Sequence, residues 1–175
     1  MTPNEIKQLI DENLRLKAEY ERLVSDEVTD RGEPSGASEE MLAACDKTWG
    51  ARLPQSYRQL LQVRDGIRFF DGDSHILSTA ELMQDWVRTE CALKGEMFVE
   101  FSDGNPFAQG ALPVMIGEDS NAMLLWEPSG DEGAGAFVEY DIVERIDDYE
   151  TVFDYIRDDT EIVSEMVSDE AEEAE

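Results

Sequence analysis

One stretch of this chain, Trp49 to Gly66, constrains the fold more than any other, because it fixes a junction between two helices. Gly50 follows an apolar-periodic segment, and glycine is favoured where a helix ends in the left-handed conformation. Pro54 suits the first turn of the helix that follows. Four apolar residues then share one helical face: Leu53, Tyr57, Leu60 and Leu61. That face needs a core to cover it, so the stretch predicts two helices that meet at Leu53 and pack on a globular domain.

The chain is strongly acidic, and its charge is unevenly distributed. Its 175 residues carry 14 Lys and Arg against 42 Asp and Glu, a net charge of −28. Residues 118–175 hold two of the basic and 21 of the acidic side chains, a net charge of −19. Such a field repels phosphate backbones and attracts basic protein surfaces. We therefore expect a basic protein partner and no nucleic-acid binding. On charge alone, the alternative that the acidity only provides solubility or reflects a salt-adapted host stays open.

Length and cysteine content indicate one domain in a reducing compartment. A chain of 175 residues is long enough for one core with extensions. Cys45 and Cys91 are two isolated thiols on predicted helices, which is not the pattern of a disulfide framework. The N-terminus lacks the basic start and apolar run of a secretory signal, and no stretch has the roughly 18 apolar residues of a membrane span. We expect a cytoplasmic protein that does not contact membranes.

Residues 1–28 predict an amphipathic helix with the spacing of a coiled coil. Its apolar stripe alternates steps of three and four residues: Ile6, Leu9, Asn13, Leu16, Tyr20 and Leu23. Asn13 falls where a buried asparagine fixes pairing register, which favours a homodimer through this helix. Alternatively, Ile10, Leu14 and Val24 widen the stripe so that the helix packs on its own domain. Residues 29–36 are dense in turn formers and form a linker.

The remaining residues alternate helices and short strands. Ser38 caps a helix that ends at Trp49, and a capping box of Ser78 and Glu81 opens another over 79–94. Asp147 with Glu150 caps the last helix. Strands are expected at 67–70, 75–77, 97–101, 112–116, 122–126 and 137–142, the first two joined by a turn at Asp71–Asp73. This order predicts an α+β domain over 37–167, with a central antiparallel or mixed sheet flanked by helices and an N-terminal helical extension. Residues 168–175 form an acidic tail too polar to fold.

Several of these segments together carry a family resemblance. They are the helix junction, the Ser38-Glu39-Glu40 helix entry, the LSTAEL step at 77–82, the segment 112–119 followed by 121–126, and the closing stretch 148–156. Their order and spacing over residues 37–158 resemble the SUKH superfamily, the Smi/Knr-type domains of fungal cell-wall regulators and bacterial immunity proteins. The resemblance implies a SUKH-like fold with this family framework: Trp49, Gly50, Leu53, Pro54, Tyr57, Leu60 and Gly66. It implies no universal set of contact residues.

Residue types that support catalysis are scarce. The sequence has one histidine, His75, and none of the phosphate-loop, hydrolase or zinc-binding motifs. The spacing of Asp71, Asp73 and His75 resembles part of a metal loop, but a hairpin turn favours the same residues for backbone reasons. Both cysteines lie on apolar helix faces, where a buried inert thiol is expected. We expect no enzyme activity, no catalytic residue, no metal and no cofactor.

The leading hypothesis is an immunity protein that neutralises a cognate toxin, such as a nuclease, by covering its basic active face. Carboxylates of the C-terminal third would steer the encounter and pair with the toxin's basic residues: Glu118, Asp119, Asp131, Glu132, Asp147 and Asp148. The alternative is a regulatory adaptor or scaffold of the cell-wall-regulator type. Phe69, Phe70, Trp86 and Trp126 are expected in the core or on strand faces, although an exposed aromatic among acidic residues is typical of an interface anchor.

Overall fold

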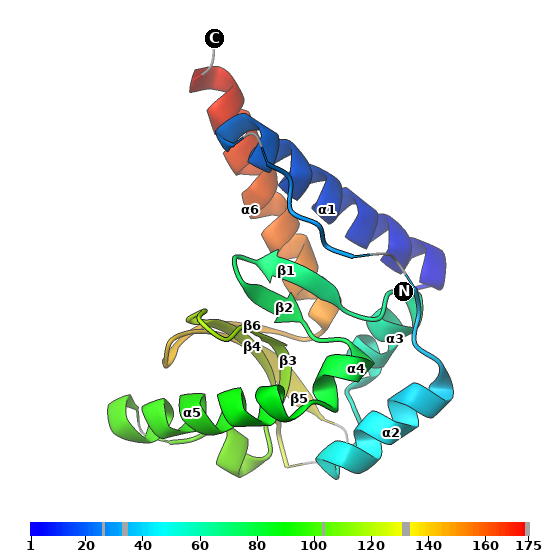
Figure 1. Cartoon of the computed structure of the whole chain (residues 1–175), viewed down its shortest axis with the longest axis vertical. Helices are drawn as coiled ribbons and strands as arrows, with labels where there is room; N and C mark the ends of the chain where they lie inside the picture. The colour runs from blue at the N-terminus through cyan, green and yellow to red at the C-terminus, as the bar shows by residue number, and fades with distance from the viewer. Residues whose placement is uncertain (26, 33–34, 103, 131–133, 174–175) are drawn as a thin grey trace.

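The computed structural model describes residues 1–25, 27–32, 35–102, 104–130 and 134–173 (Figure 1). Its helices are α1 (Pro3–Val24), α2 (Glu39–Trp49), α3 (Gln55–Val63), α4 (Thr79–Leu82), α5 (Asp85–Phe101) and α6 (Val152–Glu173), with a 3-10 turn η1 (Phe107–Gln109). Its strands are β1 (Ile67–Asp71), β2 (Ser74–Ile76), β3 (Leu112–Ile116), β4 (Ala122–Pro128), β5 (Gly135–Asp141) and β6 (Glu144–Tyr149).

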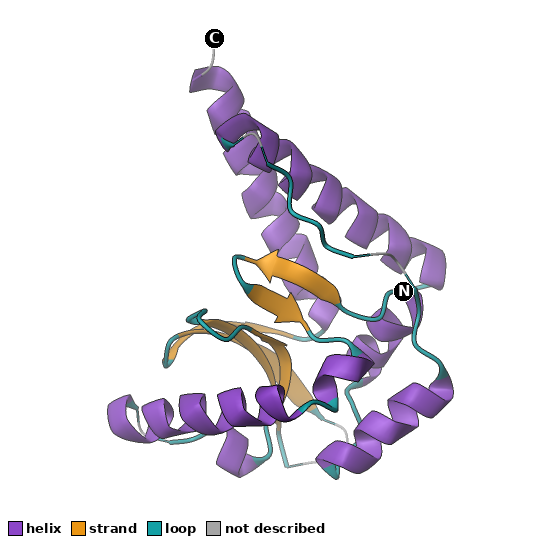
Figure 2. Ribbon diagram, in the orientation of Figure 1, coloured by secondary structure: helices purple, strands orange, loops and turns teal. Residues whose placement is uncertain are grey.

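The six strands form one antiparallel sheet in chain order, β1-β2-β3-β4-β5-β6. Helices α5 and α6 lie on opposite sides of it (Figure 2). Alternation along β5 explains this, because Tyr140 meets Phe98 of α5 at a ring-centroid distance of 5.0 Å. Phe137 lies on the other face, opposite Tyr149, which packs edge-on against Tyr155 of α6 at 5.4 Å. The predicted α+β class with a central sheet, flanking helices and an N-terminal helix is confirmed.

Helix α1 packs on its own domain, beside α6 (Figure 1). Its apolar face buries Ile6, Ile10 and Leu16. Asn13 is fully buried, and its Nδ2 donates to Asp159 Oδ2 at 2.6 Å. Of the stripe predicted as a dimer seam, Ile6, Asn13 and Leu16 are therefore buried within the chain itself, where α1 contacts α6 and α3. A homodimer through α1 stays a prediction.

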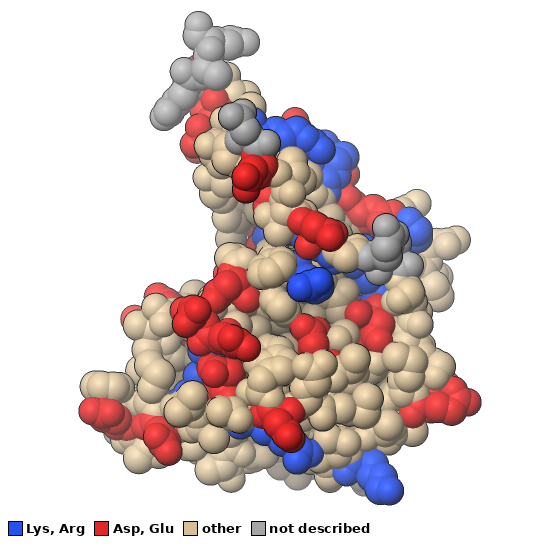
Figure 3. Space-filling model, in the orientation of Figure 1, with Lys and Arg blue, Asp and Glu red and all other residues tan. Residues whose placement is uncertain are grey.

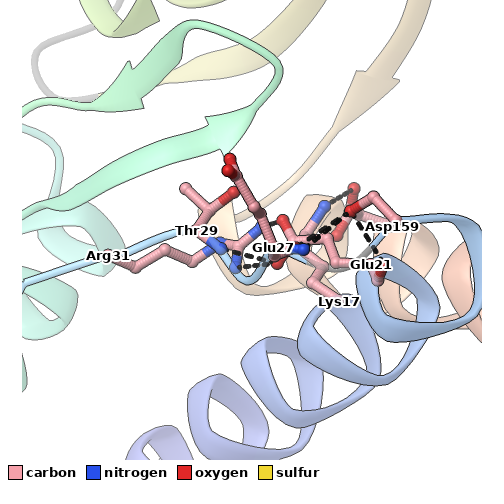
Figure 4. A network of polar contacts seen from close by, with 7 residues as sticks. Lys17, Glu21, Glu27, Thr29, Arg31 and Asp159 are labelled. Atoms are coloured by element: carbon pink, nitrogen blue, oxygen red, sulfur yellow. Dashed lines mark hydrogen bonds and ion pairs between the residues drawn. The ribbon is translucent and has the colours of Figure 1, made fainter.

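Polar contacts join α1 to the domain and to the segment that follows α1 (Figure 4). Lys17 Nζ lies 2.9 Å from Asp159 Oδ1, and the Lys17 ammonium lies 4.6 Å from the centre of the Phe70 ring. Arg31 forms a two-pronged contact with Glu21, at 2.5 and 3.2 Å. Both pairs are largely shielded from water, so each partner depends on the other for compensation of its charge.

The α2–α3 junction has the geometry that the sequence predicts. Gly50 ends α2 in the left-handed conformation, at φ 67°, and Pro54 precedes the first residue of α3. Tyr57 is fully buried, and its hydroxyl donates to the Leu77 carbonyl. The Trp49 indole donates to the Leu82 carbonyl at 2.9 Å. The family framework therefore holds α3 to the end of the β1–β2 hairpin and α2 to α4, and it lies largely in the core.

The strand predicted at 97–101 is wrong, because α5 continues through Phe101. Its buried residues, Val87, Cys91, Lys94 and Phe98, recur at helical spacing, whereas Val99 and Phe101 are exposed. The helix predicted at 79–94 is also divided: α4 ends at Leu82 and α5 begins at Asp85. Apolar residues at the end of an amphipathic helix were mistaken for a strand.

The C-terminal elements also differ from the prediction. The cap predicted for the last helix from Asp147 and Glu150 is wrong, because Asp147 lies in β6, a strand in which only Tyr149 is buried. An edge strand pairs through its backbone and needs no apolar alternation, so the pattern gave no signal of it. Helix α6 begins after Thr151, whose hydroxyl and amide contact the Asp154 carboxylate. It continues to Glu173 rather than ending at 167; three of the six residues from 168 to 173 are Glu, which favours helix.

Gly66 provides a test of this framework. It has φ 84°, and a Cβ there would lie 2.7 Å from the Ser78 amide nitrogen. Gly50 has a similar φ of 67° but open space around it. We expect Gly66→Ala to lower the free energy of unfolding by about 3 kcal/mol and Gly50→Ala by about 1 kcal/mol, because only the first adds a backbone clash to the left-handed strain. Urea denaturation measures both, and equal losses would contradict the close approach.

Candidate protein-binding pocket beside the β1–β2 hairpin

An irregularity in β1 positions the side chains of this site. The register of β1 with β2 shifts between Ile67 and Asp71, and Phe69 has φ 50°. The left-handed region is unfavourable for a bulky residue, at a cost of about 1–3 kcal/mol. Bulges redirect side chains at sheet edges, and β1 is an edge strand. Phe70 consequently enters the core, with 1% of its surface exposed, while Phe69 stays half-buried at the surface.

Phe69 forms one end of a row of aromatic side chains that lines a pocket of about 430 Å³. The Phe69 and His75 rings are edge-to-face with centroids 4.9 Å apart, and His75 and Trp86 are edge-to-face at 6.3 Å. His75 Nδ1 lies 2.7 Å from Glu81 Oε1. The other oxygen of Glu81 accepts from the Ser78 amide and hydroxyl, so the predicted capping box also orients the histidine.

Three carboxylates on two turns surround the same pocket: Asp73, Glu118 and Asp119. The Asp119 amide donates to Asp73 Oδ2 at 3.0 Å, which joins the turn after β3 to the β1–β2 turn. Gly117 permits this approach, since a Cβ there would lie 2.8 Å from the Asp73 carbonyl oxygen. Within the described part of the chain, none of the three carboxylates forms an ion pair. Acidic side chains gather over these turns in Figure 3.

The carboxylates predicted as contact residues do not form one patch. Glu118 and Asp119 lie at the pocket, whereas Asp147 and Asp148 lie on β6, at the opposite edge of the sheet. Asp148 is paired with Arg145 at 2.7 Å. Asp131 and Glu132 lie outside the described residues. The geometry therefore favours the first pair as part of a binding surface.

The sequence does not predict the aromatic row or Asp73 as contact residues. No local pattern tells which of Phe69 and Phe70 enters the core, because the bulge that decides it depends on pairing with β2. The sequence groups Asp73 and His75 with Asp71 as part of a metal loop, whereas Asp71 lines a different cavity, beside Tyr155 and Asp159. Among the residues that the structure describes, no group of three or more His, Cys, Asp or Glu side chains is placed to hold a metal ion.

A second acidic cluster lies between the sheet and α6. Asp71, Glu139, Asp158 and Asp159 line a cavity of about 200 Å³ with Tyr155. Tyr149 Oη lies 3.0 Å from Glu139 Oε2 and 3.0 Å from Asp158 Oδ2. One phenolic proton serves only one of these oxygens at a time, and a protonated Glu139 would serve the other contact. Burial raises the pKa of Glu139, and the nearby carboxylates raise it further, opposed by the Tyr149 hydrogen bond. The carboxylates of this cluster repel one another, and the ion pair of Lys17 with Asp159 offsets part of that repulsion.

Comparison with known proteins places the pocket inside a family domain. The sequence model of the SMI1 / KNR4 family (SUKH-1) matches residues 36–161, which include every pocket residue named above. Helix α1 and the last turns of α6 lie outside the match. A search of curated proteins gave no match. No helix in the described ranges combines the length and apolar character needed to cross a bilayer.

The left-handed Phe69 gives a prediction for stability. Phe69→Ala and Phe69→Gly both remove the ring, but only glycine adopts a φ of 50° without strain. We expect the glycine variant to be more stable than the alanine variant by about 1 kcal/mol, the reverse of the usual order in a strand. Thermal and urea unfolding measure the difference, and an alanine variant at least as stable as the glycine variant would show that the backbone is not strained.

The raised pKa of Glu139 gives a prediction for pH dependence. A carboxyl whose pKa is higher in the folded state binds more protons there, so its contribution to stability falls as pH rises through the interval above its ordinary value. Glu139→Gln keeps an oxygen for Tyr149 and removes the charge. We expect its stability gain over the parent to be larger at pH 7 than at pH 5, measured by urea denaturation. Glu144→Gln, an exposed change of the same charge, is the control; equal pH dependence in both variants would contradict the role of burial.

Proposed function

The chain belongs to the SMI1 / KNR4 family (SUKH-1), and on this basis we propose that it is a non-enzymatic immunity protein that neutralises a cognate toxin by binding the toxin's basic face. The observation that carries the proposal is the pocket with an acidic rim on the family domain. Asp73, Glu118 and Asp119 surround aromatic side chains there, and no described cation pairs with the three carboxylates. Aromatic anchors surrounded by complementary charge are typical of protein interfaces.

The charge of the whole chain favours a basic partner. A net charge of −28 attracts positive surfaces at long range and accelerates their association. A nuclease toxin is a suitable partner, because an enzyme that acts on nucleic acid contacts phosphates through Lys and Arg. A carboxylate-rich protein placed over those side chains would block substrate binding sterically and electrostatically. Enzyme activity of the toxin would then be lost without any chemical change.

The state of its thiols and histidine supports a binding rather than a catalytic role. Burial raises the pKa of Cys45 to about 11 and that of Cys91 to about 12, so both remain protonated at neutral pH. The His75 nitrogen that faces Glu81 is already engaged. Because both thiols are free and buried, a reducing cytoplasm suits the chain, and we place its action there.

Cell protection tests this function directly. A toxin encoded by the adjacent upstream gene should kill cells when expressed alone and fail to do so when this chain is co-expressed. Purified chain should bind that toxin and inhibit its activity at equimolar concentration. An adjacent gene that encodes no toxin, together with a pull-down that recovers regulatory proteins, would favour the adaptor alternative instead. Loss of protection in a folded, well-expressed chain would overturn the proposal.

Association kinetics test which carboxylates carry the interaction. We expect the association rate constant with the toxin to fall at least about tenfold between about 0.05 and about 0.5 M salt, because steering is screened. The double variant Glu118→Gln/Asp119→Asn should lower it about three- to tenfold at low salt. Glu144→Gln/Asp147→Asn makes the same change of charge on β6 and should have a smaller effect. A larger effect of the β6 variant would place the contact at the opposite edge of the sheet.

A further inference from the structure

We propose that the pocket beside the β1–β2 hairpin is a receptor for an arginine side chain of the partner. This inference rests on the proposed function, since it specifies which group of a basic toxin occupies the site. The pocket offers what a guanidinium recognises: aromatic rings next to carboxylates that form no ion pair with any described residue. Its volume of about 430 Å³ lies near the lower end of the range of about 300–1,000 Å³ for small-ligand pockets, which suits one side chain.

The aromatic row supplies the surface for stacking. Phe69, His75 and Trp86 follow one another edge-to-face, and all three are half-buried, so each keeps part of its ring accessible from the pocket. A planar guanidinium stacks on such faces better than an ammonium does. The row is fixed in place, because Glu81 holds His75 and the bulge holds Phe69. The aromatic row is therefore preformed, and binding of a guanidinium would cost little conformational entropy for its side chains.

The acidic rim supplies the charge. Asp73 uses one oxygen to accept from the Asp119 amide, and its other oxygen has no hydrogen-bond partner among the described residues. Glu118 and Asp119 are exposed on the same turn. The adjacent carboxylates of Glu118 and Asp119, together with that of Asp73 on the neighbouring turn, offer acceptor oxygens in several directions. That arrangement matches the forked donors of arginine, which bind carboxylates through paired hydrogen bonds.

Arg68 already places a guanidinium against the aromatic row. It is exposed, it lines the pocket, and its guanidinium carbon lies 5.5 Å from the centre of the Phe69 ring. It therefore occupies one aromatic face and adds a positive charge beside the site. If the partner group is a cation, Arg68 competes with it. If the partner group is an anion, Arg68 is required for binding, so the sign of its effect identifies the ligand.

The strain at Phe69 is consistent with selection for presentation of its ring. An unbulged strand would place Phe69, rather than Phe70, on the same face as the buried Ile67. The observed geometry instead gives the core Phe70, which packs near Tyr155 at 6.0 Å, and turns Phe69 towards His75. Strained backbone persists at sites where a specific side-chain position is needed. The arginine receptor gives that position a use.

Short peptides test the receptor without any toxin. The probe is acetyl-Gly-Arg-Gly-amide, and its citrulline counterpart keeps the shape but lacks the charge. Titration of the ¹⁵N-labelled full chain, followed by NMR, should show shifts confined to the pocket, including the Trp86 indole, for the arginine peptide. The lysine peptide should bind more weakly, and the citrulline peptide at least about tenfold more weakly. Equal shifts with the citrulline peptide, or shifts that map to β6 or α6, would overturn the proposal.

Three changes at the pocket test whether the group that it binds is a cation. Glu118→Gln/Asp119→Asn and Phe69→Gly should each weaken the arginine peptide by at least about fivefold, while amide spectra confirm the fold. Arg68→Ala removes the competing cation and should strengthen binding about two- to threefold. Glu144→Gln, remote from the pocket, should leave it unchanged. Weaker binding of the arginine peptide to Arg68→Ala would contradict a cation receptor.

Results with the peptides and with the toxin separate the two proposals. If the arginine peptide does not bind but the chain still protects cells from the toxin, the receptor is wrong and the immunity function stands. If the peptide binds at the pocket and no toxin is neutralised, the receptor stands and the immunity function is wrong. If both proposals are right, Phe69→Gly weakens the protection of cells from the toxin. Replacement of one toxin arginine by lysine or alanine should weaken toxin binding in the same way.

Discussion

The position of the β1–β2 hairpin depends on contacts that α3 and the two residues before β1 make with residues 77–79. The Tyr57 hydroxyl donates to the Leu77 carbonyl, and Gly66 lies against the Ser78 backbone, where no Cβ fits. The Asp65 carboxylate accepts from both the amide and the hydroxyl of Thr79, at 2.7 and 2.6 Å. Three successive contacts thus close the base of the segment that contains β1 and β2. The hairpin between them is held at both ends, and this fixes the positions of Phe69 and His75, the two members of the aromatic row that the hairpin carries.

Charge has two different consequences in this molecule. In the cluster of Asp71, Glu139, Asp158 and Asp159, carboxylates crowd around Lys17 and Tyr149, and burial raises the pKa of Glu139. That cluster is part of how α1 and α6 attach to the sheet. At the pocket, by contrast, the carboxylates of Glu118 and Asp119 face solvent. The same excess of acidic residues therefore strains one part of the structure and leaves another available for a basic partner.

Local patterns predicted elements well where each residue's role depends on its near neighbours. The left-handed Gly50, the start of α3 after Pro54 and the capping box of Ser78 with Glu81 all follow from short-range backbone chemistry. Patterns failed where pairing or packing at a distance decides. β6 is acidic and exposed and is a strand only because β5 offers it a backbone edge. The end of α5 is apolar and resembles a strand, but Phe98 is held as helix by contact with Tyr140.

The sequence by itself determined the class of the fold, the family framework and the sign of the charge, because these depend on residue type and spacing. Only the tertiary structure decided which acidic residues share a surface. Glu118 and Asp119 meet Asp73 because β3 pairs with β2, whereas Asp147 and Asp148 lie at the far edge because the strands pair in chain order. It likewise decided that α1 packs against α6 and that Phe69 rather than Phe70 lines the pocket. These placements depend on strand register and helix packing between residues far apart in the chain, which no local pattern specifies.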